Sequence, residues 1–193
     1  MGKVLVAAAV AAIVIACIAF AFVFYHKPSV SDLTRGVECS IRVTSVFSNN
    51  TSIPQGYTCG STGTEAYVSP PVSWSGGPPG VKSYALIMYD PDAPHGVFYH
   101  WIIYDIPPNI HHIPRGLGNS VVTRYGVQGY NSYGFVGYGP PCPPRGSVHH
   151  YVILVLALDK KLGVEKPLKP EDFIKMVRKH VIAYGCLVGL YGR

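Results

Sequence analysis

The segment YALIMYDPDAPHGVFYHWIIYDI, residues 84–106, organises the rest of the chain. It contains two apolar runs, 84–88 and 101–103, which are short and rich in Ile, Tyr and Trp. Such runs are typical of buried strands, although a buried helical segment has the same pattern. Pro91 and Pro94 lie between them and lack the backbone N–H that a sheet ladder needs. We therefore expect the polar side chains of this loop to be held at the end of a sheet, where functional sites are common: Asp90, Asp92, His95 and His100.

The remaining pattern predicts a mostly β domain with long loops rich in Pro and Gly and a short helix near the C-terminus. Residues 148–158 form the strongest strand signal, and their apolar content predicts a sheet covered on both faces. The run 69–74 contains two prolines and is predicted to be an edge strand at most. The helix is expected to begin at Pro170, with Glu171 and Asp172 in its first turn.

The N-terminal run 4–25 carries no charge, and a helix over it would span roughly 33 Å, enough for a bilayer core. It ends in bulky residues rather than in the small-residue site of a cleaved signal peptide. We expect residues 1–27 to be a single-pass membrane anchor or uncleaved signal, followed by a linker at 28–38 and a folded domain at 39–193. The domain is expected on the extracytoplasmic side. Secretion after signal cleavage is the alternative.

The charge pattern bears on the choice of partner. The net charge is +6, and the basic residues do not form a concentrated face interleaved with aromatic platforms, so no nucleic-acid partner is expected. A mild positive excess suits anionic headgroups or small phosphates.

Three polar islands can carry chemistry, at 90–100, 137–141 and 149–151. Side chains alternate along a strand, so His149 and Tyr151 share one face while His150 points to the other. Imidazole and phenol groups donate to oxygen, and the amides of a glycine-rich loop can form a nest for an anion. Together with His100 they predict a pocket for an oxyanion, in which Asp90 fixes a histidine tautomer or meets an ammonium group. Ordinary buried polar groups are the alternative interpretation.

The same islands resemble the phosphatidylethanolamine-binding protein family, especially its bacterial and archaeal branch, often called Raf-kinase-inhibitor-like. The resemblance rests on DPDAP at 90–94, HW at 100–101, GYGPPCPP at 137–144 and HHY at 149–151. It extends from about residue 41 to the end of the chain. The family fold that it implies is a central antiparallel β-sandwich with a small anion pocket at one end.

Carried over by position, the resemblance implies these pocket residues: Asp90, Ala93, Phe98, His100, Gly139, Pro141, His149 and Tyr151. Two positions depart from the family pattern. His150 stands where the family has an arginine, and because it should face away from the pocket we expect its substitution to have little effect. Pro140 stands where the branch usually has a second glycine, so it cannot donate a backbone N–H.

From these residues we expect non-catalytic binding of a small ligand that bears a phosphate or carboxylate, with no cofactor. The resemblance also implies an alternative, inhibition of a protease or kinase partner through the protein surface. A metal-dependent enzyme that uses Asp90, His100 and His149 as a 2-His-1-carboxylate set is a further alternative, although no HxxxH or CxxC pair is present. No GxSxG motif of a serine hydrolase occurs either.

Cysteine spacing allows a statement about redox state. Cys17 lies in the apolar N-terminal run, and the other four cysteines allow three pairings. We favour Cys59 with Cys142, in loops beside the expected pocket, and Cys39 with Cys186, between the first and last strand-like segments. Four free thiols are the alternative; an exported domain would retain disulfides.

Overall fold

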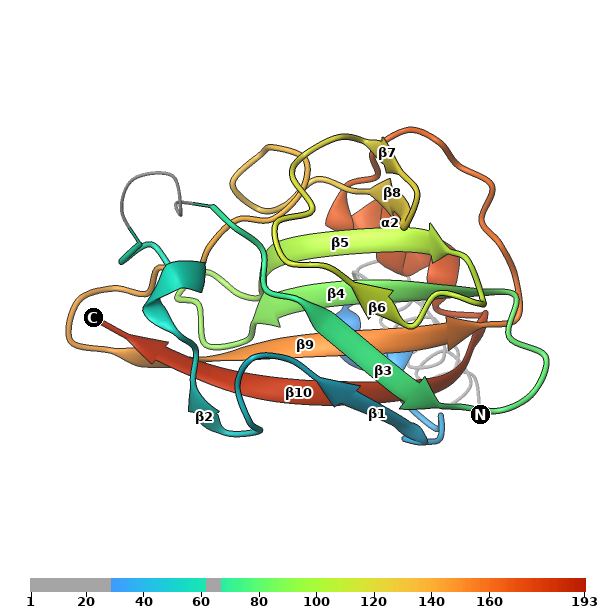
Figure 1. Cartoon of the computed structure of the whole chain (residues 1–193), viewed down its shortest axis with the longest axis horizontal. Coiled ribbons are helices and arrows are strands. Elements are labelled where there is room, and N and C mark those ends of the chain that lie inside the picture. The colour runs from blue at the N-terminus through green and yellow to red at the C-terminus, as the bar shows by residue number, and fades with distance from the viewer. Residues whose placement is uncertain (1–28, 62–66) are drawn as a thin grey trace, which may run out of the picture.

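The computed structural model describes residues 29–61 and 67–193, and this part of the chain contains two β-sheets (Figure 1). The large sheet has seven strands, in the order β2 (Thr51–Ser52), β10 (Val181–Gly192), β9 (Val148–Leu158), β4 (Ser83–Asp90), β5 (Phe98–Ile106), β8 (Gly126–Gln128) and β7 (Val122–Thr123). The small sheet has the order β1 (Ile41–Thr44), β3 (Val72–Gly76) and β6 (His112–Ile113). The helices are the 3-10 turns η1 (Val30–Leu33) and η2 (Gln55–Tyr57) and the α-helix α2 (Pro170–Val177).

Both faces of the large sheet are covered. One face packs against the small sheet, with Met88 of β4 and Trp101 of β5 directly paired and buried there. Their neighbours in sequence, Ile87 and Ile102, are paired in the same register and point to the opposite face, beneath α2 and η1. Figure 1 shows the small sheet in front of the large one and α2 behind it. This two-sided burial explains why the central strands read as continuous apolar runs rather than alternating ones.

The strand predictions at 84–88, 101–103 and 148–158 are confirmed, and two details differ. Strand β5 begins at Phe98, so His100 lies within the strand rather than in the preceding loop. Strand β3 is not an edge strand, because β1 and β6 pair with its two sides. It accommodates the prolines because Pro70 and Pro71 precede its first residue, Val72, and therefore need not donate to the ladder. The strands pair antiparallel except for β2, which is parallel to β10.

The predicted transmembrane helix is corrected. Within the described ranges, no helix is long and apolar enough to cross a membrane. The α-helix α2 has eight residues and therefore a length of roughly 12 Å, less than half of a hydrocarbon core of about 30 Å. The run 4–25, on which the prediction was placed, lies outside the described residues. The fold that the described residues support is a mostly β sandwich with one short α-helix among them, and the single-pass membrane location is not retained.

The segment predicted as a polar linker contains an anchored turn. Ser29 caps η1 by accepting a hydrogen bond from the Ser31 backbone, while the Asp32 carboxylate accepts one from the Ser29 backbone N–H. Val30 and Leu33 are buried in the apolar cluster that also contains residues of α2. The first described residues therefore pack against the face of the large sheet that α2 also covers.

Three segments meet at one end of the large sheet, on the side where Figure 1 marks the C-terminus. Asp90, the last residue of β4, pairs with Phe98, the first residue of β5. Strand β9 begins beside them, and its His149 pairs with Tyr191 near the end of β10. The fold thus brings the polar residues of β4, β5 and β9 together at one end of the large sheet.

Candidate functional site

A cavity of about 390 Å³ lies at this end of the large sheet. Six of the eight residues implied by the family resemblance line it together: Asp90, Ala93, Phe98, His100, His149 and Tyr151. The other two, Gly139 and Pro141, are not among the lining residues. Gly139 contacts His100, and the Pro141 carbonyl accepts a hydrogen bond from the Cys59 backbone N–H at 3.0 Å.

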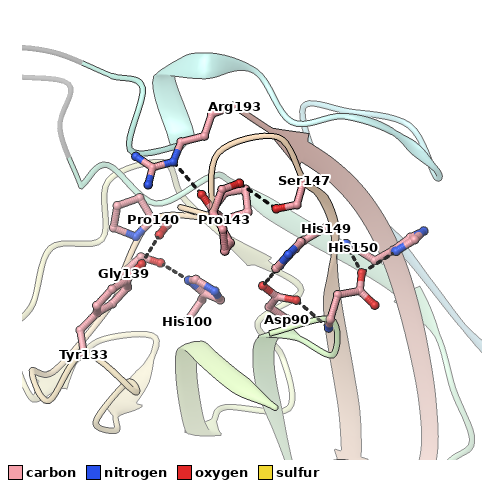
Figure 2. A network of polar contacts seen from close by, with 12 residues as sticks. Asp90, His100, Tyr133, Gly139, Pro140, Pro143, Ser147, His149, His150 and Arg193 are labelled. Atoms are coloured by element: carbon pink, nitrogen blue, oxygen red, sulfur yellow. Dashed lines mark hydrogen bonds and ion pairs between the residues drawn. The ribbon is translucent and has the colours of Figure 1, made fainter. Parts of the chain in front are cut away.

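The floor of the cavity contains a buried histidine–carboxylate pair (Figure 2). His149 Nδ1 lies 2.7 Å from Asp90 Oδ2, and both residues are almost completely buried. A carboxylate can only accept, so the shared hydrogen belongs to Nδ1 of His149. The other oxygen of Asp90 accepts the backbone N–H of Asp92 at 2.8 Å. Asp90 therefore fixes the histidine tautomer, as the sequence suggested, and also closes the turn that follows β4.

Two hydrogen bonds join His100 to Gly139, one through its ring and one through its backbone. The carbonyl oxygen of Gly139 lies 2.8 Å from His100 Nδ1, and the N–H of Gly139 donates to the His100 carbonyl at 2.8 Å. Burial lowers the pKa of His100 to about 4, against the opposing effects of the Gly139 carbonyl, the charge of Asp90 and the Pro140 carbonyl. His100 is therefore a neutral imidazole at neutral pH.

Tyr151 contributes a hydroxyl group with no protein partner. Its oxygen is buried and makes no hydrogen bond to any residue that the structure describes. Burial, followed by the negative charge of Asp90, raises the pKa of Tyr151 well above its ordinary value. The phenol therefore keeps its proton and can donate it in a hydrogen bond.

The expected nest of loop amides at 137–141 is absent. The Gly137 N–H donates to the Gly129 carbonyl and the Gly139 N–H to the His100 carbonyl, while Pro140 and Pro141 have no N–H. The loop instead directs a carbonyl at His100, and the Pro140 carbonyl accepts the Tyr133 hydroxyl at 3.0 Å. Its role here is to position the histidine and the cavity wall.

His150 points away from the cavity, as strand alternation predicted, yet it contacts the loop that lines the cavity. Its backbone N–H and its Nδ1 each lie 2.7 Å from Asp92 Oδ2. The backbone N–H of His150 is the main reason that the pKa of Asp92 is lowered; burial opposes it, and the His150 side chain adds to the lowering. Two successive histidines of β9 thus hold the two carboxylates of the DPDAP motif.

The rim of the cavity includes residues that sequence reasoning missed. Tyr133 packs edge-to-face on Phe98, with ring centroids 4.7 Å apart. Arg193, the last residue, donates from Nε to the Pro143 carbonyl at 2.6 Å. Both line the cavity, together with Val97 and with His95, which the sequence had already indicated in the polar loop. Tyr133 lies in an irregular segment and Arg193 at the chain end, so neither has a periodic pattern that would have indicated its position.

A disulfide joins Cys59 to Cys142, with 5.3 Å between the Cα atoms, and agrees with the first predicted pairing. Cys142 lines the cavity, so this bond ties the rim to the loop after η2. The second predicted pairing is not formed, because Cys39 and Cys186 are free and exposed. Cys39 is paired in register with Tyr184 rather than with Cys186, which lies two residues further along β10.

The alternative of a metal site would use Asp90, His100 and His149 as ligands. In residues 29–61 and 67–193, no group of three or more His, Cys, Asp and Glu side chains is arranged to hold a metal ion. The Nδ1 atoms of His100 and His149 are occupied by Gly139 and Asp90 respectively.

Comparison with known proteins agrees with this fold. A family model described as phosphatidylethanolamine-binding protein matches residues 43–192. The chain therefore belongs to the phosphatidylethanolamine-binding protein family. Among its relatives is a UPF0098 protein of Pyrococcus horikoshii, 44% identical over 158 residues that cover 80% of this chain and 77% of that protein. A UPF0098 protein of Pyrococcus abyssi is 42% identical over 162 residues, covering 82% of this chain and 88% of that protein.

Two solved structures share the fold. The crystal structure of Escherichia coli YbcL, described as a member of the mammalian PEBP family, has a TM-score of 0.72 and 31% identity, covering 80% of this chain and 99% of that one. The structure of a putative phosphatidylethanolamine-binding protein homologue from Chlamydia trachomatis has a TM-score of 0.70 and 35% identity, covering 80% of this chain and 98% of that one.

Proposed function

We propose that this domain binds a small phosphate-bearing ligand in the cavity between β4, β5 and β9 without converting it. The observation that carries the proposal is the Tyr151 hydroxyl, a protonated donor buried at the cavity without a partner in the described chain. An unpaired buried donor destabilises a fold, and a ligand oxygen that reached it would remove that cost. His149 and His100 border the same space and supply further polar atoms.

The size and walls of the cavity support a ligand larger than phosphate itself. A volume of about 390 Å³ is in the range of sites for small organic molecules. Val97, Phe98 and Pro143 contribute apolar side chains to the lining, while Arg193 places a cation among the lining residues. This arrangement suits an acidic group at the floor and an organic substituent toward the mouth.

The residues present favour binding over catalysis. Cys142, the one cysteine among the described lining residues, is held in a disulfide and so offers no thiol nucleophile. Burial raises the pKa of both lining phenols, Tyr133 and Tyr151, so neither is ionised at neutral pH. The family description, which names a phospholipid with a phosphate headgroup, supports the same class of ligand.

Calorimetric titration of phosphoethanolamine into the wild-type protein and into His100→Ala tests this proposal. Removing a protein group that hydrogen-bonds to a charged ligand typically weakens binding by about one to two decades, so His100→Ala should weaken binding by that factor. His112→Ala is the matched control, because His112 is exposed on the small sheet and contacts Ser73 instead of the cavity. Absence of binding by the wild type, or an equal loss in both variants, would overturn the proposal.

A further inference from the structure

Resting on the proposed function, we infer that the cavity selects an oxyanion that still carries a proton. A phosphate monoester bound as its monoanion fits this description, and a sulfate ester does not. The direction of the hydrogen bond at His100 decides this selectivity, because it determines whether the ligand must donate or accept there.

The carbonyl of Gly139 decides which ring nitrogen of His100 carries the hydrogen. A carbonyl oxygen can only accept, and it lies 2.8 Å from Nδ1, so Nδ1 is the donor (Figure 2). In the neutral imidazole, Nε2 then has a lone pair and no hydrogen. The hydrogen bond that the His100 ring makes within the described chain is the one from Nδ1 to Gly139; the Pro140 carbonyl also acts on the ring by favouring its protonated form, and His100 lines the cavity. His100 therefore presents an acceptor to the ligand.

The surroundings keep His100 in this neutral form. Burial lowers its pKa to about 4, and this outweighs the opposing effects of two carbonyls and of Asp90. Titratable or charged side chains border the cavity from the segments around His100: Asp90 from β4, His95 from the loop between β4 and β5, Tyr133 from the loop between β8 and β9, His149 and Tyr151 from β9, and Arg193 after β10. Asp90 also holds the hydrogen of His149 on Nδ1.

An anion with no hydrogen would place a lone pair against the lone pair of His100. To avoid this, either the ligand or the histidine must take up a proton. With a pKa of about 4, protonation of His100 at pH 7 costs roughly three decades of affinity. A phosphate monoester has its second pKa near 6, so its protonation costs only roughly one decade. A sulfate ester has no such proton, and it must bear the full cost at the histidine.

The test compares two ligands of the same shape, phosphoethanolamine and ethanolamine O-sulfate, by calorimetry on the full chain at about pH 7. We expect the phosphate ester to bind at least tenfold more tightly. Since about nine-tenths of a phosphate monoester is dianionic at that pH, its binding should take up about 0.9 proton. Titrations in two buffers with different ionisation enthalpies measure this uptake. Equal or tighter binding of the sulfate ester, or no proton uptake with the phosphate ester, would overturn the inference.

The outcomes separate this inference from the proposed function. If both esters bind alike without proton uptake, the inference fails and the proposed function stands. If neither ester binds, both fail. His100→Gln supplies a side-chain amide that can rotate to donate, so the preference for phosphate over sulfate should shrink toward one, whereas His112→Gln should leave it unchanged. If His100→Gln does not fold, the two-ligand and two-buffer comparisons on the wild type still decide the matter.

Discussion

His150 Nδ1 and the His150 backbone N–H both lie 2.7 Å from the same oxygen, Oδ2 of Asp92. This contact joins the first residues of β9 to the DPDAP loop on the side of the sheet that faces away from the cavity. The adjacent pair, His149 with Asp90, does the same on the cavity side. The loop at 91–97, which supplies much of the cavity wall, is thus held by β9 from both faces of the strand.

His150→Ala should therefore weaken ligand binding, although His150 does not line the cavity. The expected loss is about two- to fivefold, because a half-exposed pair contributes modestly and the backbone contact to Asp92 remains. His150→Arg should retain most of the affinity, because a guanidinium can pair with the same carboxylate. Calorimetry on both variants measures the effect. A loss as large as that of His100→Ala would contradict it by placing His150 among the ligand contacts.

His100 should remain neutral, as its Nδ1–H tautomer, at every pH above about 5, because burial lowers its pKa to about 4. Two-bond ¹H–¹⁵N correlation spectra report the tautomer and the titration midpoint directly. A midpoint near the ordinary histidine value of 6.5 would show that burial does not control this group.

The same depressed pKa determines the direction in which the stability of the fold changes with pH. The unfolded chain binds a proton at His100 more readily than the folded one, so stability is fully present above pH 6.5 and falls as pH drops from 6.5 toward 4. His100→Gln should remove this part of the pH dependence in thermal unfolding scans, whereas the exposed control His112→Gln should not.

Loss of the Cys59–Cys142 bond should lower both stability and ligand affinity. The two cysteines are 83 residues apart, and a crosslink over a loop of this length is worth about 2–5 kcal/mol. Cys59→Ser should lower the melting temperature, and it should weaken binding because Cys142 lines the cavity. Thiol labelling of the folded, unreduced protein should modify Cys39 and Cys186 but not Cys59 or Cys142. Labelling of all four would contradict the assignment.

The sequence allowed the central strands and six of the cavity-lining residues to be predicted. Strand alternation correctly separated His149 and Tyr151 from His150, because the period of a strand is a local property of the backbone. What it could not supply were contacts between distant segments. The pairing of His150 with Asp92 joins residues 58 positions apart, and the position of Tyr133 against Phe98 depends on an irregular loop.

The glycine-rich loop shows a different limit. Its composition favoured a nest of amides, but which N–H groups are free depends on the strands that the loop packs against. The carbonyl groups of Gly129 and His100 accept the N–H groups of Gly137 and Gly139. The residue identities were therefore predicted from the family pattern, while the chemical role of the loop was not.

Gly139→Ala tests that role. A Cβ atom at position 139 would lie 2.4 Å from Cδ2 and 2.8 Å from Cε2 of the Tyr133 ring, so either the ring or the loop must move. If the loop moves, His100 loses a contact with each backbone polar group of Gly139. We expect a destabilisation of about 1–3 kcal/mol and weaker ligand binding. Gly56→Ala is the matched control, because nothing lies within 4 Å of a Cβ built there.

The double variant Gly139→Ala/Tyr133→Ala tests whether the clash with the Tyr133 ring causes that loss. Removing the Tyr133 ring removes the clash, so the double variant should recover affinity relative to Gly139→Ala alone, and the two changes should be strongly non-additive. Calorimetry and thermal unfolding on the wild type, both single variants and the double variant complete the cycle. Additive losses would show that the Tyr133 ring does not set the space at Gly139. The glycine would then be required for a reason other than the close approach of this ring.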